Sequence, residues 1–144
     1  MEEKHEENDR LIRQGELGVD LTWSSWYPLR KAEIITIVPE EYGIYKIRQV
    51  GGVSVPRLVG KSEIIYIGRS GISPTRTLRV RLMELLAGRH IASPRVKRLR
   101  EELNLSLEYC FAVTQTPESA EKLILMLYEK EHYELPPLNH VGGL

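Results

Sequence analysis

The sequence contains very little of what marks a secreted or membrane-bound protein. Its one cysteine, Cys110, excludes a framework of disulfides within the chain and any zinc site with more than one thiolate. The longest uninterrupted apolar run, Leu123 to Leu127, is far shorter than the roughly 20 residues that cross a bilayer. The N-terminus is acidic where a secretion signal would be basic. We therefore expect a soluble, cytoplasmic protein without a membrane partner.

The chain also lacks a net charge, because 20 Lys and Arg residues balance 20 Asp and Glu residues. This balance excludes a uniformly basic, histone-like chain and an acidic disordered tail. The charges are nevertheless distributed unevenly: residues 69–100 carry nine basic side chains and one acidic one, whereas residues 101–144 carry two and eight. Most of the basic side chains are arginines, whose planar guanidinium suits phosphate oxygens. The segment indicates either a polyanionic partner or two amphipathic helices with solvated basic faces.

A chain of 144 residues can bury one sizeable core but not two. Residues 1–22 are rich in charge and poor in large apolar side chains, so we expect a flexible or frayed segment there and one domain over residues 23–144. An aromatic cluster, Trp23, Trp26 and Tyr27, begins this domain. Such a cluster either packs onto the core as an N-terminal clasp or stacks on nucleotide bases.

The residue pattern predicts an α+β domain in which helices flank a small three-stranded antiparallel sheet. The β-branched segment Ile34 to Val38 is expected to be extended, and Gly43 to Arg48 with Glu63 to Ile67 forms an antiparallel hairpin. Leu105 to Val113 is a later strand. The expected order is strand, hairpin, helix, helix, strand, helix.

Three helices are expected between and after these strands. Leucines at helical spacing form the first, which Gly88 ends. Ser93 begins a short basic helix that runs to about Leu103. The last helix starts at Pro117, and Pro136 and the residue after it end that helix in an extended tail.

Two tripeptides stand on the neighbouring strands of the hairpin, Gly43-Ile44-Tyr45 and Tyr66-Ile67-Gly68. A glycine beside a tyrosine on each strand lets a phosphodiester backbone approach closely while two phenolic hydroxyls converge on one site. The sequence here resembles the GIY-YIG nucleases, a family that includes intron-homing endonucleases, the incision subunit of bacterial nucleotide excision repair and some restriction enzymes. The resemblance implies a GIY-YIG-like α/β sandwich that cuts DNA.

More of the family pattern follows the tripeptides. A short turn leads to a helix whose arginine, Arg81, matches the catalytic arginine of the family. Some members show an Ala-Glu pair, then a tyrosine seven residues later, then a His-Gly-Glu-Leu-Pro-Pro-Leu-Asn ending. Ala120-Glu121, Tyr128 and the segment from His132 to Asn139 match this arrangement, except that Tyr133 stands where those members have glycine.

Glu121 is therefore the metal ligand that the resemblance favours. A gapless alignment to the shorter helix of the excision-repair member would instead place Leu127 at the metal position, which leaves Glu129 as the ligand or the site degenerate. Helical spacing puts Glu121 on the face of Leu125 and Tyr128. A carboxylate on an apolar face needs a partner such as a divalent cation, although a first-turn glutamate also suits the helix dipole.

The resemblance implies roles for these side chains in phosphodiester hydrolysis. Mg²⁺ or Mn²⁺ on Glu121 polarises the scissile phosphate, and Arg81 stabilises the developing charge. Tyr45 acts as general base or orients the attacking water, and Tyr66 aligns the nucleophile or helps to deprotonate it. We expect Arg69, Arg81 and the metal to lower the pKa of a tyrosine hydroxyl enough for this chemistry.

Other basic side chains are expected to hold the DNA. Arg81 flanks the buried leucines of its helix, whereas Arg76 and Arg79 point further from the site. The amide of Asn139 either contacts the DNA backbone or braces the site. The side chains predicted to bind DNA are Arg69, Arg79, Arg89, His90, Arg95, Lys97, Arg98 and Asn139.

The sequence thus predicts a divalent-metal-dependent DNA endonuclease. One alternative is a nucleic-acid-binding module with a degenerate GIY-YIG site, and another is a structural domain in which Tyr45 and Tyr66 only pack. The residues outside the expected domain are too few for a separate targeting module, so we expect one of three ways of targeting: the domain itself recognises DNA, it acts on DNA structure, or a homodimer or an accessory targeting protein assists it. The neutral charge of the chain favours the last of these.

Overall fold

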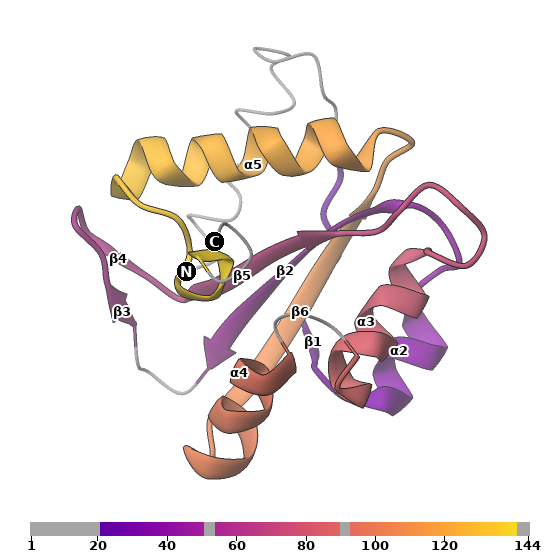
Figure 1. The fold of residues 1–144 in the computed structure, drawn as a ribbon, viewed down its shortest axis with the longest axis horizontal. Helices are drawn as coiled ribbons and strands as arrows, with labels where there is room; N and C mark the ends of the chain where they lie inside the picture. Colours follow the sequence, from indigo (N-terminus) through magenta and orange to yellow (C-terminus); the bar gives the residue numbers. More distant parts are fainter. Residues whose placement is uncertain (1–20, 51–53, 90–92, 141–144) are drawn as a thin grey trace.

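The computed structural model describes residues 21–50, 54–89 and 93–140. These residues form a mixed α+β fold around one antiparallel sheet (Figure 1). The sheet has four strands, so the prediction of three strands was wrong. In spatial order the strands are β1 (Tyr27–Pro28), β6 (Ser106–Val113), β2 (Gly43–Val50) and β5 (Ile64–Arg69).

Helices cover both faces of this sheet (Figure 1). The long helix α5 (Pro117–His132) lies on one face. Three shorter helices lie on the other, and they are α2 (Lys31–Ile37), α3 (Leu78–Ala87) and α4 (Ser93–Lys97). Small elements complete the described residues: a hairpin of β3 (Val55–Pro56) and β4 (Lys61–Ser62), a π-helical turn (Arg98–Glu102) and a 3-10 helix (Pro137–His140). No helix in these ranges is long and apolar enough to cross a bilayer.

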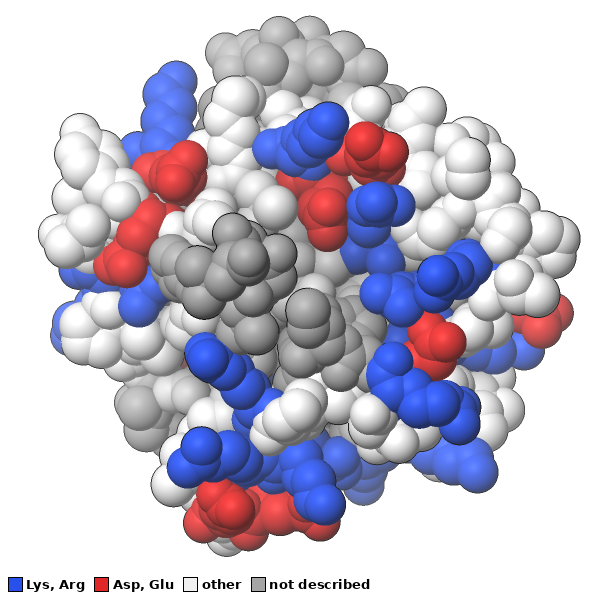
Figure 2. Space-filling view, in the orientation of Figure 1, with Lys and Arg blue, Asp and Glu red and all other residues white. Residues whose placement is uncertain are grey.

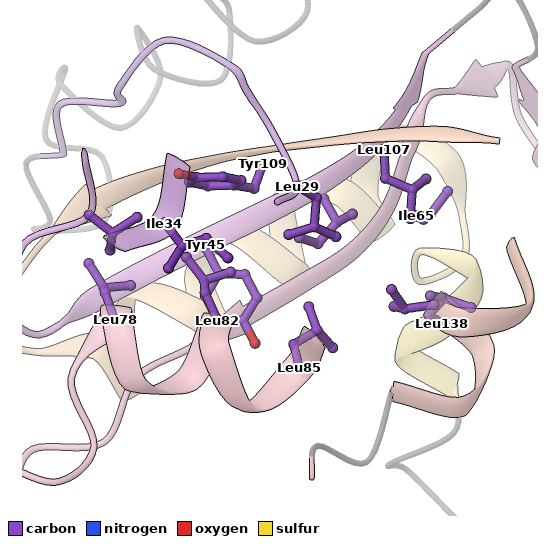
Figure 3. Packing of buried hydrophobic residues seen from close by; sticks show 13 residues of the cluster. Leu29, Ile34, Tyr45, Ile65, Leu78, Leu82, Leu85, Leu107, Tyr109 and Leu138 are labelled. Carbon is purple, nitrogen blue, oxygen red and sulfur yellow. The ribbon is translucent and has the colours of Figure 1, made fainter. Parts of the chain in front are cut away.

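The alternation of side chains along β2 divides the core in two. Tyr45 and Ile47 face the short helices and join the cluster shown in Figure 3. Ile44 faces α5 and packs with Leu123 and Ile124. Burial of these apolar side chains on both faces holds the sheet between its two layers of helices.

The aromatic cluster after residue 20 packs onto these cores, as one of the two interpretations of the sequence expected. Trp23 is buried in the core under α5, and Trp26 packs against the same core. Two cations of β2 lie over their rings, with Lys46 Nζ 4.1 Å from the ring centre of Trp23 and Arg48 Cζ 4.2 Å from that of Trp26. Cation–π attraction therefore adds to apolar packing in this clasp.

The expected strand at Ile34 to Val38 is instead the end of helix α2. Ile34 and Val38 are completely buried, whereas Ile35 between them is exposed. Residues four apart share one face of a helix, whereas a strand buries alternate residues. Val38 N donates a hydrogen bond to Ile34 O at 3.1 Å, which continues the helical ladder. Tertiary packing of two side chains on one face thus outweighs the β propensity of the segment.

The strand that the prediction lacked is β1. Tyr27 pairs with Tyr109 and Pro28 pairs with Glu108 at the edge of the sheet. Proline is tolerated there because an edge strand can leave one side of its backbone unpaired. Two residues are too few to show a strand pattern in a sequence.

The other predicted elements are confirmed with small shifts in their bounds. Strands β2 and β5 form the antiparallel hairpin, and α3 ends at Gly88, which has φ of 86°. The basic helix forms as α4 and the π-helical turn. The extended tail is not confirmed, because residues from Pro137 to His140 form a 3-10 helix. The frayed segment predicted over residues 1–22 falls almost entirely outside the described residues, and Leu21 is buried in the core under α5.

Helix α5 ends at a residue whose backbone conformation suits glycine. Tyr133 has φ of 61°, and its backbone N–H donates to Glu129 O at 2.7 Å as the C-cap. A side chain in the left-handed region costs free energy because Cβ crowds the backbone, and the exposed Tyr133 ring recovers little of that cost by burial.

Tyr133→Gly is therefore expected to raise the free energy of unfolding by about 0.5 to 1 kcal/mol. Glycine removes the backbone strain of the folded state, and the larger conformational entropy that it gives the unfolded chain offsets part of this gain. Urea unfolding measures this change. The control Lys130→Gly, at an exposed position inside the same helix, should lower stability by about 1 kcal/mol. A Tyr133→Gly variant less stable than the parent would show that the tyrosine is favourable there.

Candidate active site

The glycines of the two tripeptides make room for the protein itself. A Cβ added at Gly68 would lie 2.5 Å from Cζ and Oη of Tyr45, the residue opposite it on β2. A Cβ at Gly43 would lie 2.1 Å from Ala112 O and 2.8 Å from Leu78 Cδ1. Protein atoms thus fill the space that was expected for a phosphodiester backbone. Glycine is needed at position 68 because the backbone of β5 packs directly against the Tyr45 ring, and at position 43 because the backbone of β2 packs directly against that of β6.

Tyr45 and Tyr66 lie side by side on one face of the hairpin. Their ring centres are 6.1 Å apart and the rings are tilted by 43°. Tyr45 is completely buried, whereas Tyr66 is partly exposed and is joined to Tyr45 by a side-chain hydrogen bond. The two hydroxyls therefore converge as expected, and Tyr66, unlike Tyr45, lines the cavity described next.

A cavity of about 510 Å³ is lined by residues from the end of β5, from the loop after it and from the N-terminal parts of α3 and α5. Small-molecule sites have volumes of about 300 to 1,000 Å³, so this cavity is large enough for part of a nucleotide strand. Four separate segments of the chain contribute to its wall. The lining residues are Tyr66, Arg69, Ser70, Gly71, Arg76, Arg81 and Glu121.

Ser70, a buried residue of the pocket lining, fixes the chain there through three hydrogen bonds. Its Oγ accepts a hydrogen bond from Gly43 N at 2.9 Å and donates to Gly71 O at 2.8 Å. Its backbone N–H donates to Gly43 O, also at 2.9 Å. These bonds tie the start of β2 to the end of β5, so that the two tripeptides keep one register.

Two ion pairs orient the charged side chains of the pocket. Arg69 Nε lies 3.4 Å from Oε1 of Glu121, and Arg81 Nη1 donates to Oε1 of Glu84 at 3.0 Å. Burial raises the pKa of the Glu121 carboxyl, and the positive charge of Arg69 opposes that rise. An ionised Glu121 therefore gains from a second cation beside it.

The arginines by themselves do not lower the pKa of the tyrosine hydroxyls, a lowering that the sequence predicted from Arg69, Arg81 and a metal ion together. Burial is the largest influence on both, and it raises the pKa of Tyr45 well above its ordinary value. Burial and the negative charge of Glu121 raise the pKa of Tyr66 to about 12, although Arg81 acts in the opposite direction. Desolvation thus outweighs the nearby cations, and both hydroxyls keep their protons at neutral pH.

Arg79 lies outside the pocket, whereas Arg76 lines it. Arg79 points away from the site as expected, because its Nε donates to Val38 O at 2.8 Å and its Nη1 lies 3.5 Å from Glu40. This arginine ties α3 to the end of α2. Arg76 was expected to point away as well, but it lines the pocket. Sequence reasoning missed it because it precedes α3 and lies in a loop, where helical geometry does not apply.

Asn139 braces the outer edge of the sheet. Its Nδ2 donates to Ile67 O at 2.8 Å, and its Oδ1 accepts from Ile67 N at 2.9 Å. The amide thereby pairs with both backbone groups of one residue on edge strand β5. Of the two roles considered for Asn139, the structure places the side chain in the bracing one.

The remaining basic residues predicted to bind DNA lie away from the pocket. Arg95, Lys97 and Arg98 are exposed on α4 and the turn after it, where Arg98 Nε lies 3.1 Å from Glu102. Figure 2 shows Lys and Arg side chains gathered both there and beside α3. Arg89 is exposed just after α3, and His90 falls outside the described residues.

The pocket suits a magnesium or manganese ion better on Glu121 than on Glu129. Glu121 lines the pocket, whereas Glu129 is exposed further along α5. Mg²⁺ keeps several waters and commonly binds through one or two carboxylates together with substrate phosphates. The part of the chain that the structure describes contains no cluster of three or more His, Cys, Asp or Glu that could enclose a metal. The single carboxylate of Glu121 in an open pocket fits an ion held partly by its substrate.

Comparisons of the chain with protein-family models, with curated proteins and with solved structures find no match.

The raised pKa of Tyr66 predicts a loss of stability in alkali. The folded protein holds this proton more tightly than the unfolded chain, whose tyrosines titrate near pH 10. As the pH rises from about 10 to about 12, the unfolded chain therefore loses its proton first, and Tyr66 lowers the free energy of unfolding by up to about 1.4 kcal/mol per pH unit.

Urea unfolding between pH 9 and 11 measures this slope. In Tyr66→Phe the slope should be shallower, whereas the control Tyr133→Phe, which changes an exposed ring, should retain it. Equal slopes in the parent and in Tyr66→Phe would contradict the burial of the Tyr66 hydroxyl.

Proposed function

We propose that the chain is a divalent-metal-dependent endonuclease of the GIY-YIG type that hydrolyses phosphodiester bonds in DNA. The observation that supports this proposal is the meeting of Tyr66, Arg81 and Glu121 in one pocket. They come from β5, α3 and α5, which are distant in the sequence, and each is a residue that the family resemblance selected. The mixed α+β fold with an antiparallel sheet agrees with the coarse fold class that was expected, although the sheet has four strands and not three.

Arg81 is placed to stabilise negative charge on the phosphate that reacts. Its guanidinium lines the pocket while Glu84 accepts a hydrogen bond from Nη1. This contact orients the planar group and leaves its other N–H donors for phosphate oxygens. Arg69, whose Nε lies 3.4 Å from Oε1 of Glu121, supplies a second guanidinium in the same pocket. Preorganised donors of this kind contribute most where charge develops in the transition state.

Glu121 would hold Mg²⁺ or Mn²⁺ in this pocket. When bound, the ion supplies Lewis-acid polarisation of the phosphate and lowers the pKa of a bound water. Burial of the Glu121 carboxylate raises its pKa, so the site is one in which an ionised carboxylate benefits from a cation. Arg69 orients the Glu121 carboxylate at the wall of the pocket.

Tyr66 acts as a hydrogen-bond donor in this proposal, because its hydroxyl stays protonated at neutral pH. A neutral phenol can donate to a phosphate oxygen or orient the attacking water. Tyr45 lies beneath it, completely buried, and positions it through their shared hydrogen bond. Hydrolysis adds one water across a P–O bond: the water oxygen joins phosphorus, and its proton ends on the leaving sugar oxygen.

The exposed cations on α4 and the following turn would contact the duplex outside the pocket. Phosphate contacts of this kind release counterions, so they supply affinity that depends on salt concentration. Arg95, Lys97 and Arg98 are the residues proposed for this role, and Arg89 adds to them. Because acidic neighbours offset several of these charges, we propose that a homodimer or an accessory protein completes targeting.

The protonated tyrosines favour one other function, a nucleic-acid-binding module with a degenerate site. Neither Tyr45 nor Tyr66 has a pKa that suits a base at neutral pH. In that case the arginines of the pocket would bind phosphate without cleaving it.

Cleavage assays separate these functions. Purified protein should cut supercoiled plasmid, single strands or a branched duplex with Mg²⁺ or Mn²⁺ but not with EDTA. Glu121→Gln and Arg81→Gln should each lower the rate by about 10²- to 10³-fold, the scale of losing a main electrostatic stabiliser. The control Glu118→Gln, in an exposed first-turn residue of the same helix, should retain the parent rate.

Metal-dependent cutting that survives in both variants would contradict the proposed site, and loss in Glu129→Gln alone would move the metal ligand to Glu129. Salt-sensitive DNA binding with no cutting of any substrate would support the binding module.

A further inference from the structure

Arg76 differs from the other two arginines of the pocket. Arg69 pairs with Glu121 and Arg81 pairs with Glu84, so a carboxylate offsets part of the charge of each. Arg76 lines the same pocket, yet none of the described carboxylates lies within ion-pairing distance of it. Its charge is therefore available to a ligand.

Arg76 provides the positive charge that no carboxylate of the pocket offsets. Glu121 pairs with Arg69 and Glu84 pairs with Arg81, so the three arginines of the lining leave one charge in excess, that of Arg76. This charge matches one phosphodiester besides the one that Arg81 serves. A volume of about 510 Å³ leaves space for a second phosphate beside the first. A metal ion on Glu121 would increase this excess further.

The backbone holds Arg76 in place at the rim. Gly71 N donates to Arg76 O at 2.8 Å, and Arg76 N donates to Ser73 O at 2.9 Å, which closes the loop on itself. The side-chain stem rests on Gly71, where an added Cβ would lie 2.6 Å from Cβ and 3.1 Å from Cγ of Arg76. A side chain held at its base loses less conformational entropy when it binds a ligand.

We propose that Arg76 binds the phosphate next to the scissile one on the same strand, so that the pocket recognises two consecutive phosphates. Arg81 and Glu121 serve the scissile phosphate, and Arg76 serves its neighbour. The identity of the ligand as a nucleic-acid strand rests on the proposed nuclease function. Recognition of two phosphates does not require that the strand be cut, so the two proposals can fail separately.

Two small probes test this inference on the full chain in EDTA, where no cleavage can occur. Thymidine 3′,5′-bisphosphate carries two linked phosphates, and thymidine 5′-monophosphate carries one. Calorimetric titration should show at least about tenfold tighter binding of the bisphosphate by the parent protein, because a charge-assisted hydrogen bond contributes on that scale. Arg76→Gln should weaken the bisphosphate by about tenfold and change the monophosphate by less than about twofold.

A second variant and a control keep the test independent of one substitution. Gly71→Ala displaces the stem of Arg76 without removing its charge, and it should also weaken the bisphosphate more than the monophosphate. The control Lys122→Gln removes an exposed cation of α5 that pairs with Glu118, and it should leave both affinities unchanged. Thermal unfolding of each variant shows whether it folds.

Equal weakening of both probes by Arg76→Gln, or no weakening of either, would overturn the inference. If the parent protein cuts no DNA but prefers the bisphosphate in an Arg76-dependent way, the nuclease proposal fails and this one stands. If cutting depends on Glu121 and Arg81 but the parent protein does not prefer the bisphosphate, the nuclease proposal stands and the two-phosphate inference fails.

Discussion

The close approach of β2 and β5 at Tyr45 and Gly68 is the contact on which the rest of the site depends. No side chain other than hydrogen fits at position 68, because a Cβ would lie 2.5 Å from the Tyr45 ring. This packing buries the Tyr45 phenol under the edge strand and sets Tyr66 beside it on the same face. It also fixes where β5 ends, and Arg69 at that end reaches Glu121 on the opposite layer of helices. Asn139 holds the outer side of the same strand.

Burial raises the pKa of three titratable groups of the site more than the nearby arginines lower it. The Glu121 carboxyl and both tyrosine hydroxyls have a raised pKa, although Arg69 or Arg81 acts against each rise. An ionised Glu121 in this setting destabilises the fold relative to a neutral side chain at neutral pH. Such a cost at a cluster of polar residues is typical of a site selected for function rather than stability. In the proposed mechanism, the raised pKa makes Tyr66 a hydrogen-bond donor and not a proton acceptor.

The sequence predicted those parts of the fold in which a local pattern and the tertiary contacts agree. The hairpin, α3 and α5 have such patterns, with glycines, a helical leucine stripe and a proline at the first turn. Ile34 to Val38 was predicted wrongly because β-branched residues favour a strand, and only the burial of Ile34 with Val38 shows the helical face. The short strand β1 exists through its pairing with β6 and has no pattern of its own.

Some residues of the candidate site could likewise be predicted from the sequence, and others could not. The residues that line the pocket from helices, Arg81 and Glu121, could be selected by motif and by helical face. Arg76 could not, because its position depends on a loop that folds back onto Gly71. The protonated state of Tyr66 could not be predicted either, since it depends on how much the folded chain buries the ring. Loop geometry and desolvation are properties of the folded chain and not of a motif.

The position of a bound Mn²⁺ tests the central claim most directly, because it does not depend on cleavage or on finding the right DNA. Paramagnetic broadening of backbone amide signals in a Mn²⁺ titration reports which residues lie near the ion. The account predicts that signals around Arg69, Ser70 and Arg81 broaden first and that Glu121→Gln abolishes this broadening. Broadening centred on Glu129, or a pattern unchanged in Glu121→Gln, would contradict it.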